Sequence, residues 1–154
     1  MENRGRSPPV HEFHGNFKCK QGNFTNAFIR VTSVTGHVFS LDFTSKYQSW
    51  DNVDPAELFY AKTEKKPEGK GGMVKHLERE AKGMDYLVLW LDCDREGENI
   101  CFEVIQCTQG SMRKSVQGQH IYRARFSAVT PKDIEKVCYA MLMLCLCLCF
   151  ALRR

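Results

Sequence analysis

The sequence has no pair of cysteines in a C-x-x-C arrangement, although it contains 8 cysteines. Zinc ribbons and thioredoxin-like redox sites are built on such pairs, so their absence argues against both classes. The opening stretch MENRGRSPPVHEF is charged and proline-rich, and it lacks the apolar run of a secretory signal. We therefore expect reduced thiols in an intracellular protein, most of them buried as small apolar side chains.

The sequence also lacks an apolar run of the ~20 residues that span a bilayer. Its longest candidate covers residues 137–152, VCYAMLMLCLCLCFAL, followed by two arginines. A tail anchor is a marginal alternative for this segment, and burial against a partner is the favoured interpretation. Its Cys145, Cys147 and Cys149 are potential soft-metal ligands, but they alternate with leucine and lack turn residues, which argues against a metal site. We expect no membrane partner.

The composition indicates one globular domain. The chain has 154 residues, of which 43% are hydrophobic and 26% charged, so it is long enough to bury a core. The net charge of +4 permits an anionic partner such as nucleic acid but does not require one.

Apolar and β-branched runs alternate with helical patterns along the chain. Strands are expected within 28–43, broken at Gly36-His37, in the continuous apolar run 86–91, and in the segment 120–130. Segment 62–72 is expected to be a charged loop. Solvation of its charges is favoured over the alternative, a contact with phosphate groups.

Helix signals fall between these strands. Residues 73–82 have helical spacing and end before Gly83, and Asp54-Pro55 and Thr130-Pro131 each combine an N-cap with proline at the first helical position. Four apolar residues share one face of a further expected helix: Ile100, Cys101, Val104 and Ile105. The alternation predicts an α/β fold with a mostly parallel sheet flanked by helices.

The most informative stretch is LWLDCDREGENI, residues 89–100. If the chain stays extended past the strand, Asp92, Asp94 and Glu96 point to the same side. Their place at the carboxyl end of a parallel strand is where α/β folds locate their sites. Such oxygen ligands suit Mg²⁺, Gly97 permits a sharp turn, and a helix starting near Glu98 would offer its N-terminus to a phosphate.

Two alternatives fit the same residues. The EF-hand pattern matches with one mismatch and would end at Glu103, but it requires an entering helix where a strand is expected. The other alternative is a solvated loop in which Arg95 screens the acids and the carboxylates favour the helix N-terminus through its dipole.

Four segments together resemble the Toprim domain of type IA DNA topoisomerases, and most closely the topoisomerase III class in its eukaryotic beta form. They are SVTGHVFSLDF, KYQSWDNVDPAELF, DYLVLWLDCDREGENICFEVI and RARFSAVTPKDI. The resemblance runs from about Val10 to about Val137. It divides the chain into a disordered lead-in at 1–9, a partial Toprim domain at 10–137 and an unrelated apolar tail at 138–154.

The resemblance implies a function and its residues. Family members cut one DNA strand with a tyrosine, pass another strand through the gap and reseal it, which relaxes underwound DNA without ATP. Asp92, Asp94 and Glu96 are the implied catalytic acids that hold Mg²⁺. The implied nucleic-acid contacts are His37, Arg95, Arg123 and Arg125, with a structural imidazole as an equal alternative for His37. The implied partners are single-stranded or underwound DNA, RNA for some members, and an accessory protein. The implied location is the nucleus.

The departures from the family pattern set its limits. The family's first strand, which ends in a catalytic glutamate, has no counterpart here, because Glu2 and Glu12 lie in a different context. None of the five tyrosines lies in the motif of the family's nucleophile. We therefore expect the chain alone to be inactive, with a non-catalytic module that binds metal or nucleic acid as the alternative function.

Overall fold

The computed structural model describes residues 7–19, 22–49, 51, 53–69, 71–113, 120–140 and 142–143. Two antiparallel hairpins and a small mixed sheet make up its strands. The first hairpin pairs β1 (Val10–Cys19) with β2 (Gly22–Thr32), and the second pairs β3 (Phe39–Phe43) with β4 (Thr63–Pro67). In the mixed sheet, β6 (His120–Arg123) lies between β5 (Tyr86–Leu89) and β7 (Leu142–Met143).

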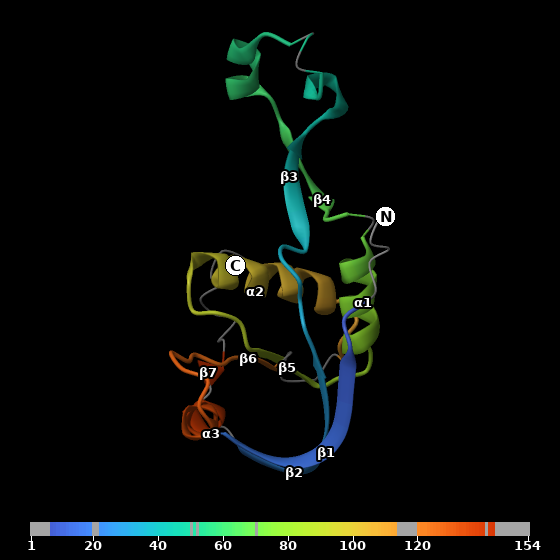
Figure 1. Cartoon of the computed structure of the whole chain (residues 1–154). Helices are drawn as coiled ribbons and strands as arrows, with labels where there is room; N and C mark the ends of the chain where they lie inside the picture. The colour runs from blue at the N-terminus through green and yellow to red at the C-terminus, as the bar shows by residue number, and fades with distance from the viewer. Residues whose placement is uncertain are drawn as a thin grey trace, which may run out of the picture.

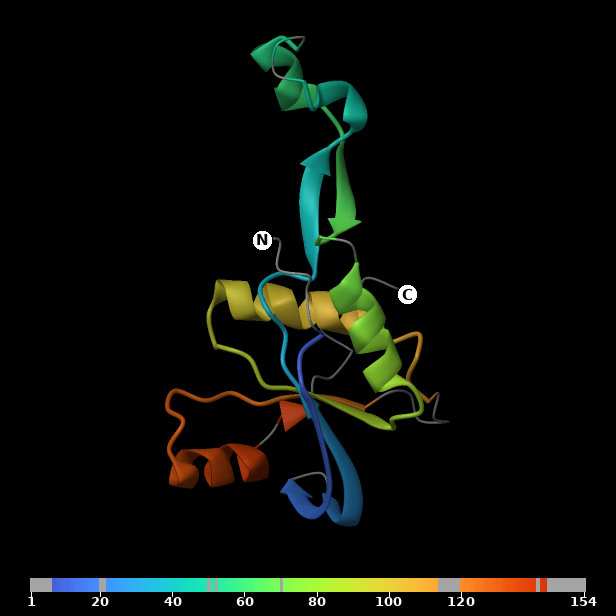
Figure 2. The same cartoon turned by 45° about the vertical axis from the view of Figure 1, so that its right-hand side comes forward.

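Within the described residues, three α-helices and two 3₁₀ helices connect these strands. The helices α1 (Gly72–Ala81) and α2 (Arg95–Thr108) pack against each other, whereas α3 (Pro131–Ala140) contacts β1. The second hairpin projects away from the body and carries η1 (Ser45–Tyr47) and η2 (Pro55–Tyr60) at its far end (Figures 1 and 2). We call this projection, residues 39–67, the arm.

The α/β class is confirmed, but the sheet is not mostly parallel among the described strands. Only β5 and β6 pair in parallel, and β7 joins β6 in the antiparallel sense. Strands β1 and β2 are separated by only two residues, a connection that antiparallel strands alone allow. Residues 10–27 carry no strand pattern of their own, so most of this hairpin was not predicted.

Two further expectations were wrong in detail. Segment 62–72 is not wholly a loop, because β4 forms within it by pairing with β3, and its charged side chains are tolerated on an arm surrounded by solvent. The run 86–91 is not buried on both faces, because Leu89 is 2% exposed whereas Tyr86 and Val88 are 42% and 40% exposed. One face of β5 packs on the helices, and the other is half open.

The helix signals were correct. Gly83 follows α1 with a positive φ of 75°, and Asp133 N–H donates to the Thr130 hydroxyl at the start of α3. Asp54 caps η2 by accepting from Ala56 N–H. The predicted boundary at residue 137 falls within α3, which continues to Ala140.

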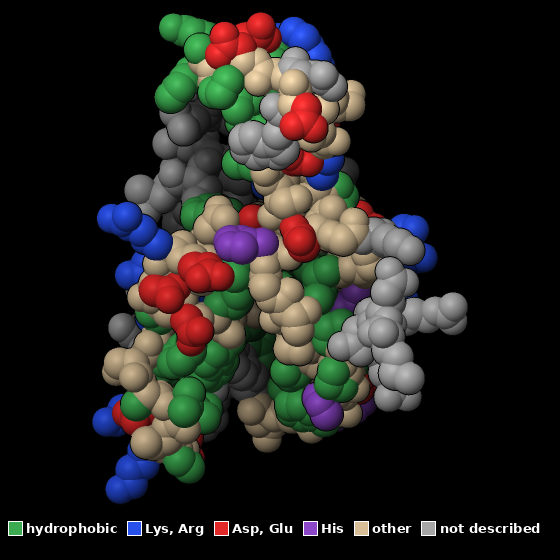
Figure 3. All heavy atoms as spheres, turned by 45° about the horizontal axis from the view of Figure 1, so that its top comes forward, with side chains coloured by type: hydrophobic (Ala, Val, Ile, Leu, Met, Phe, Trp, Pro, Cys, Tyr) green, Lys and Arg blue, Asp and Glu red, His purple; other side chains and the backbone are tan. Residues whose placement is uncertain are grey.

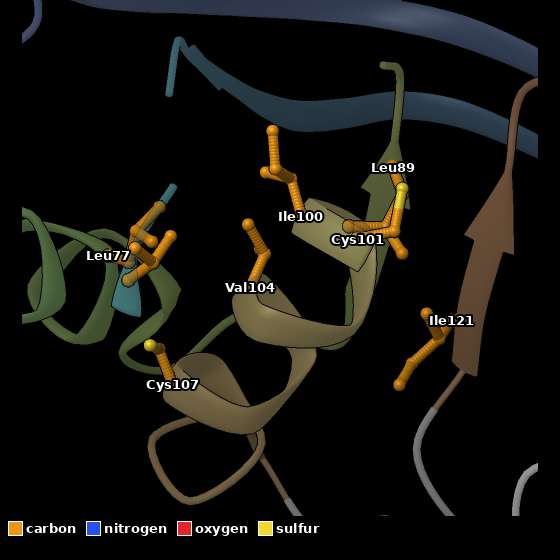
Figure 4. Packing of buried hydrophobic residues seen from close by; sticks show 8 residues of the cluster. Leu77, Leu89, Ile100, Cys101, Val104, Cys107 and Ile121 are labelled. Atoms are coloured by element: carbon orange, nitrogen blue, oxygen red, sulfur yellow. The ribbon is translucent and has the colours of Figure 1, made fainter. Parts of the chain in front are cut away.

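The main core lies between α1, α2 and the β5–β6 pair (Figure 4). Helix α2 contributes the face that the sequence predicted: Ile100, Cys101 and Val104 are buried and Ile105 is partly buried. Burial raises the pKa of the Cys101 thiol, and it raises that of Cys107 to about 11. These two thiols therefore behave as apolar core groups, as expected.

Partly buried polar contacts fasten the first hairpin to α1. His76 Nε2 lies 2.8 Å from the Thr32 hydroxyl on β2, and Arg79 lies 3.0 Å from His76 Nδ1. The pKa of His76 is lowered, mainly because the imidazole is buried. Arg30 of β2 donates a further hydrogen bond to the Glu80 carbonyl of α1, and within the hairpin it forms an ion pair with Glu12. The hairpin and α1 thus form one packed unit.

None of the helices in the described ranges is long and apolar enough to cross a membrane. The predictions for Cys145, Cys147 and Cys149, and most of the predicted lead-in 1–9, lie outside the described residues.

Candidate functional site

The acidic stretch follows β5 and turns directly into α2. Asp94 is the N-cap of this helix, and its Oδ1 accepts a hydrogen bond of 2.7 Å from Gly97 N–H. The helix begins at Arg95 rather than near Glu98, so Glu96 lies in its first turn. The backbone bends at residues 93 and 94 before α2 begins, so the extended backbone that the spacing requires ends before Glu96. Asp92, Asp94 and Glu96 are all exposed.

Gly97 has a packing role that differs from the predicted sharp turn. A Cβ atom at this position would lie 2.1 Å from the Asp92 carbonyl oxygen and 3.2 Å from Asp94 Oδ1. Glycine thus lets the first turn of α2 rest on the backbone of the acidic loop. This close approach fixes where Asp92 and Asp94 leave the strand.

Arg123 fastens the same loop from inside. Its side chain is 2% exposed, and Nη1 donates to the carbonyl oxygens of Leu91 at 2.8 Å and Ala124 at 2.7 Å. Nη2 donates to the Asp92 carbonyl at 2.8 Å and forms an ion pair of 3.0 Å with Glu98. Because its guanidinium nitrogens already donate to these partners, Arg123 positions the acidic loop. Its contact with nucleic acid stays a prediction.

Arg95 and Arg125 present free charges at the acidic edge. Both are exposed, and neither makes an ion pair or side-chain hydrogen bond with another described residue. Arg125 follows β6, whose Arg123 is in register with Leu89 of β5, so the carboxyl ends of the two parallel strands meet here. Phe126 N–H also donates to Cys93 Sγ at 3.4 Å, which joins the two strand ends.

Glu103 connects α2 to the Gly36-His37 segment, and sequence analysis missed this role. It is buried, and its Oε2 accepts from Val38 N–H at 2.7 Å while Oε1 accepts from Asn99 Nδ2 at 3.1 Å. The EF-hand interpretation is wrong, because a strand enters the loop and the Glu103 carboxylate faces a segment 65 residues away. The available signal in the sequence was a glutamate placed among the apolar residues of the expected helix, which indicates a carboxylate that needs an internal partner.

His37 lies between the acidic edge and this buried carboxylate. Its Nε2 is 3.6 Å from Glu96 Oε1, and its Nδ1 is 3.6 Å from Glu103 Oε1. The imidazole is partly exposed. On the face shown in Figure 3, acidic side chains and a histidine gather near the middle of the molecule. His37 is thus a predicted nucleic-acid contact whose side chain lies next to the carboxylate of a predicted metal ligand, Glu96.

The predicted metal ligands fit Mg²⁺ by their chemistry. In the described part of the chain, no group of three or more His, Cys, Asp or Glu side chains is gathered closely enough to hold an ion. Mg²⁺ needs only one or two protein carboxylates, since waters and substrate phosphate oxygens complete its shell. Asp92 and the second oxygen of Asp94 are open to solvent and available for this purpose.

An open pocket with a volume of about 630 Å³ adjoins this edge. It is lined by residues before and within β3, by the arm's second strand and by α2, among them His37, Phe39, Leu41, Lys65, Asn99 and Glu103. His37 is therefore shared between the pocket and the acidic edge.

Comparisons with known proteins show which family the chain belongs to. Residues 13–129 match the Toprim domain family. The chain is 53% identical over 137 residues to DNA topoisomerase 3-beta of Arabidopsis thaliana and 51% identical over 138 residues to DNA topoisomerase 3-beta-1 of Homo sapiens. Each match covers 88% of this chain and 15% of the relative. DNA topoisomerase 3-alpha of Homo sapiens is 40% identical over 114 residues. The resemblance predicted from the four sequence segments is confirmed: this chain belongs to the Toprim domain family.

Proposed function

We propose that this chain is the Toprim part of a topoisomerase 3-like, type IA DNA topoisomerase. In this role it binds Mg²⁺ and positions a phosphate of single-stranded DNA beside the ion. The observation that carries the proposal is the loop after β5, where Asp92 and Asp94 face solvent on a backbone fixed by Gly97 and Arg123. Similarity to topoisomerases over most of the chain supports the substrate class.

Each residue at the edge has a distinct part in this proposal. Asp92 and Asp94 would hold Mg²⁺, with Glu96 reaching it from the first turn of α2. The bound ion would neutralise charge on the phosphate and stabilise the oxygen that leaves when the strand is cut. Arg95 and Arg125 offer uncommitted guanidinium groups that can neutralise neighbouring phosphates.

Asp94 also keeps the site in place. One of its oxygens caps α2, so the helix N-terminus and the proposed ion share a single carboxylate. Because the capping bond needs only an oxygen acceptor, asparagine preserves it while removing the charge. Asparagine variants therefore change metal binding without removing the helix cap.

The proposal predicts Mg²⁺-dependent binding of single-stranded DNA. Replacing Asp92 and Asp94 together by asparagine should weaken the Mg²⁺-dependent part by at least on the order of tenfold, the effect typical of losing even an outer partner of a metal ligand. Fluorescence anisotropy of a labelled oligonucleotide, with Mg²⁺ or with EDTA, measures this. Asp54→Asn is the matched control, because it exchanges another N-cap aspartate far out on the arm.

Equal affinity with Mg²⁺ and EDTA, in both the unmodified chain and the double variant, would contradict the metal role. The same assay with an RNA oligonucleotide tests whether the substrate class extends to RNA. We further propose that strand cleavage requires a tyrosine from outside this chain. Relaxation of underwound plasmid by the purified chain, abolished by Asp92→Asn, would overturn that part and favour a self-sufficient enzyme.

A further inference from the structure

The pocket beside the acidic edge has a size and position that the metal role does not explain. Its volume of about 630 Å³ lies within the range of small-ligand sites, roughly 300–1,000 Å³. It opens to solvent and shares His37 with the acidic edge, where Glu96 is 3.6 Å away. A ligand attached to a phosphate at the edge would therefore have the pocket within reach.

One wall of the pocket is apolar. Phe39 and Leu41 are two residues apart on β3, so they share a face, and Lys65 is paired directly with Leu41 across the arm. The Lys65 ammonium lies 4.5 Å from the centre of the Phe39 ring and donates to Gln106 Oε1. Leu41 remains 73% exposed. The uncovered apolar surface of this wall is therefore that of Leu41, because Phe39 is partly buried against the core and lies under Lys65.

The opposite wall offers hydrogen-bonding groups without excess charge. The Thr35 hydroxyl and the Asn99 amide oxygen bond to no other described residue. Glu103 is already engaged by Val38 N–H and Asn99. The remaining lining charges, Lys65 and Glu68, are of opposite sign. A neutral group with polar edges and an apolar face suits this lining better than a phosphate does.

We propose that the pocket is a subsite for one base of a single-stranded nucleic acid, next to the phosphate held at the acidic edge. The base would rest against Leu41 and the edge of Phe39 and direct its polar edge toward Asn99 and Thr35. This inference rests on the proposed function, because the phosphate that brings the base to the pocket is the one placed by Asp92 and Asp94.

A combined change in protein and DNA tests the subsite. A labelled single-stranded oligonucleotide is compared with versions that lack one base at successive positions. Binding to the unmodified chain with Mg²⁺ should weaken about five- to tenfold when one particular base is missing. In Leu41→Ala the intact oligonucleotide should bind about five- to tenfold more weakly, and the missing base should make no further difference. Since Leu41 is exposed, this variant should fold normally.

Phe59→Ala is the matched control, because Phe59 is an exposed apolar residue elsewhere on the arm, 89% exposed. It should leave both affinities unchanged. If the intact oligonucleotide binds but every missing base has the same effect, or Leu41→Ala keeps the position dependence, the subsite is overturned while the proposed function stands. If the intact oligonucleotide does not bind at all, the proposed function and the subsite both fail.

Discussion

Replacing Arg123 with alanine is expected to lower the free energy of unfolding by about 3 to 5 kcal/mol. The guanidinium is the internal donor for carbonyl oxygens at Leu91, Asp92 and Ala124, and alanine leaves these acceptors without their partner. It also leaves a cavity beneath the acidic loop. Because a domain is stable by only about 5–15 kcal/mol, the variant should be largely unfolded at moderate urea concentration. Urea titration followed by circular dichroism measures the change.

Two further arginine variants make this result specific. Arg123→Lys should recover only part of the stability, since one ammonium cannot reproduce the planar fork that serves several carbonyls. Arg125→Ala removes an exposed arginine at the same edge and should change the unfolding free energy by less than about 0.5 kcal/mol. If Arg123→Ala and Arg125→Ala are equally stable, Arg123 does not hold the loop.

Gly97→Ala is expected to destabilise the fold by about 3 kcal/mol through overpacking and the loss of the Asp94 cap. The added methyl would lie 2.1 Å from the Asp92 carbonyl oxygen, so the loop and the first turn of α2 must separate. This shift displaces both aspartates, and Mg²⁺ affinity should fall with stability. Thermal unfolding with and without Mg²⁺ reports both effects.

Gly72→Ala is the matched control for this substitution. Gly72 also lies in the first turn of a helix, but a Cβ there meets no atom within 4 Å. The control should be unchanged or up to about 1 kcal/mol more stable, because alanine restricts the unfolded chain. A Gly97→Ala variant that behaves like Gly72→Ala would show that the contact with Asp92 is not needed.

Sequence patterns predicted the elements whose signals are local. Thr130-Pro131 marked the start of α3, Gly83 followed the end of α1, and the apolar spacing around Ile100 identified the buried face of α2. Each signal depends on neighbouring residues alone. Residues 10–27 of the first hairpin carried no such signal, because this segment mixes histidine, glycine and asparagine among its aromatic residues. Strand β4 was missed because pairing with β3, rather than its own composition, makes it a strand.

The acidic residues of the site were predicted from the sequence, but the residues that hold them in place were not. The acids were found because their charges follow an apolar strand. The extended spacing does not reach Glu96, because α2 starts at Arg95, one residue before it. The role of Arg123 depends on backbone carbonyls about 30 residues away, and that of Glu103 on an amide 65 residues away. Such contacts leave no spacing pattern in a single sequence.

Direct titration with Mg²⁺, by calorimetry and by backbone amide chemical shifts, tests the central claim that the loop after β5 binds the ion. The folded chain should show saturable binding, with shifts concentrated at residues 92–97. The Asp92→Asn and Asp94→Asn double variant should keep its helix and lose this binding, whereas Asp54→Asn should keep both. Saturable Mg²⁺ binding that survives unchanged in the folded double variant, or no binding by the unmodified chain, would contradict the claim.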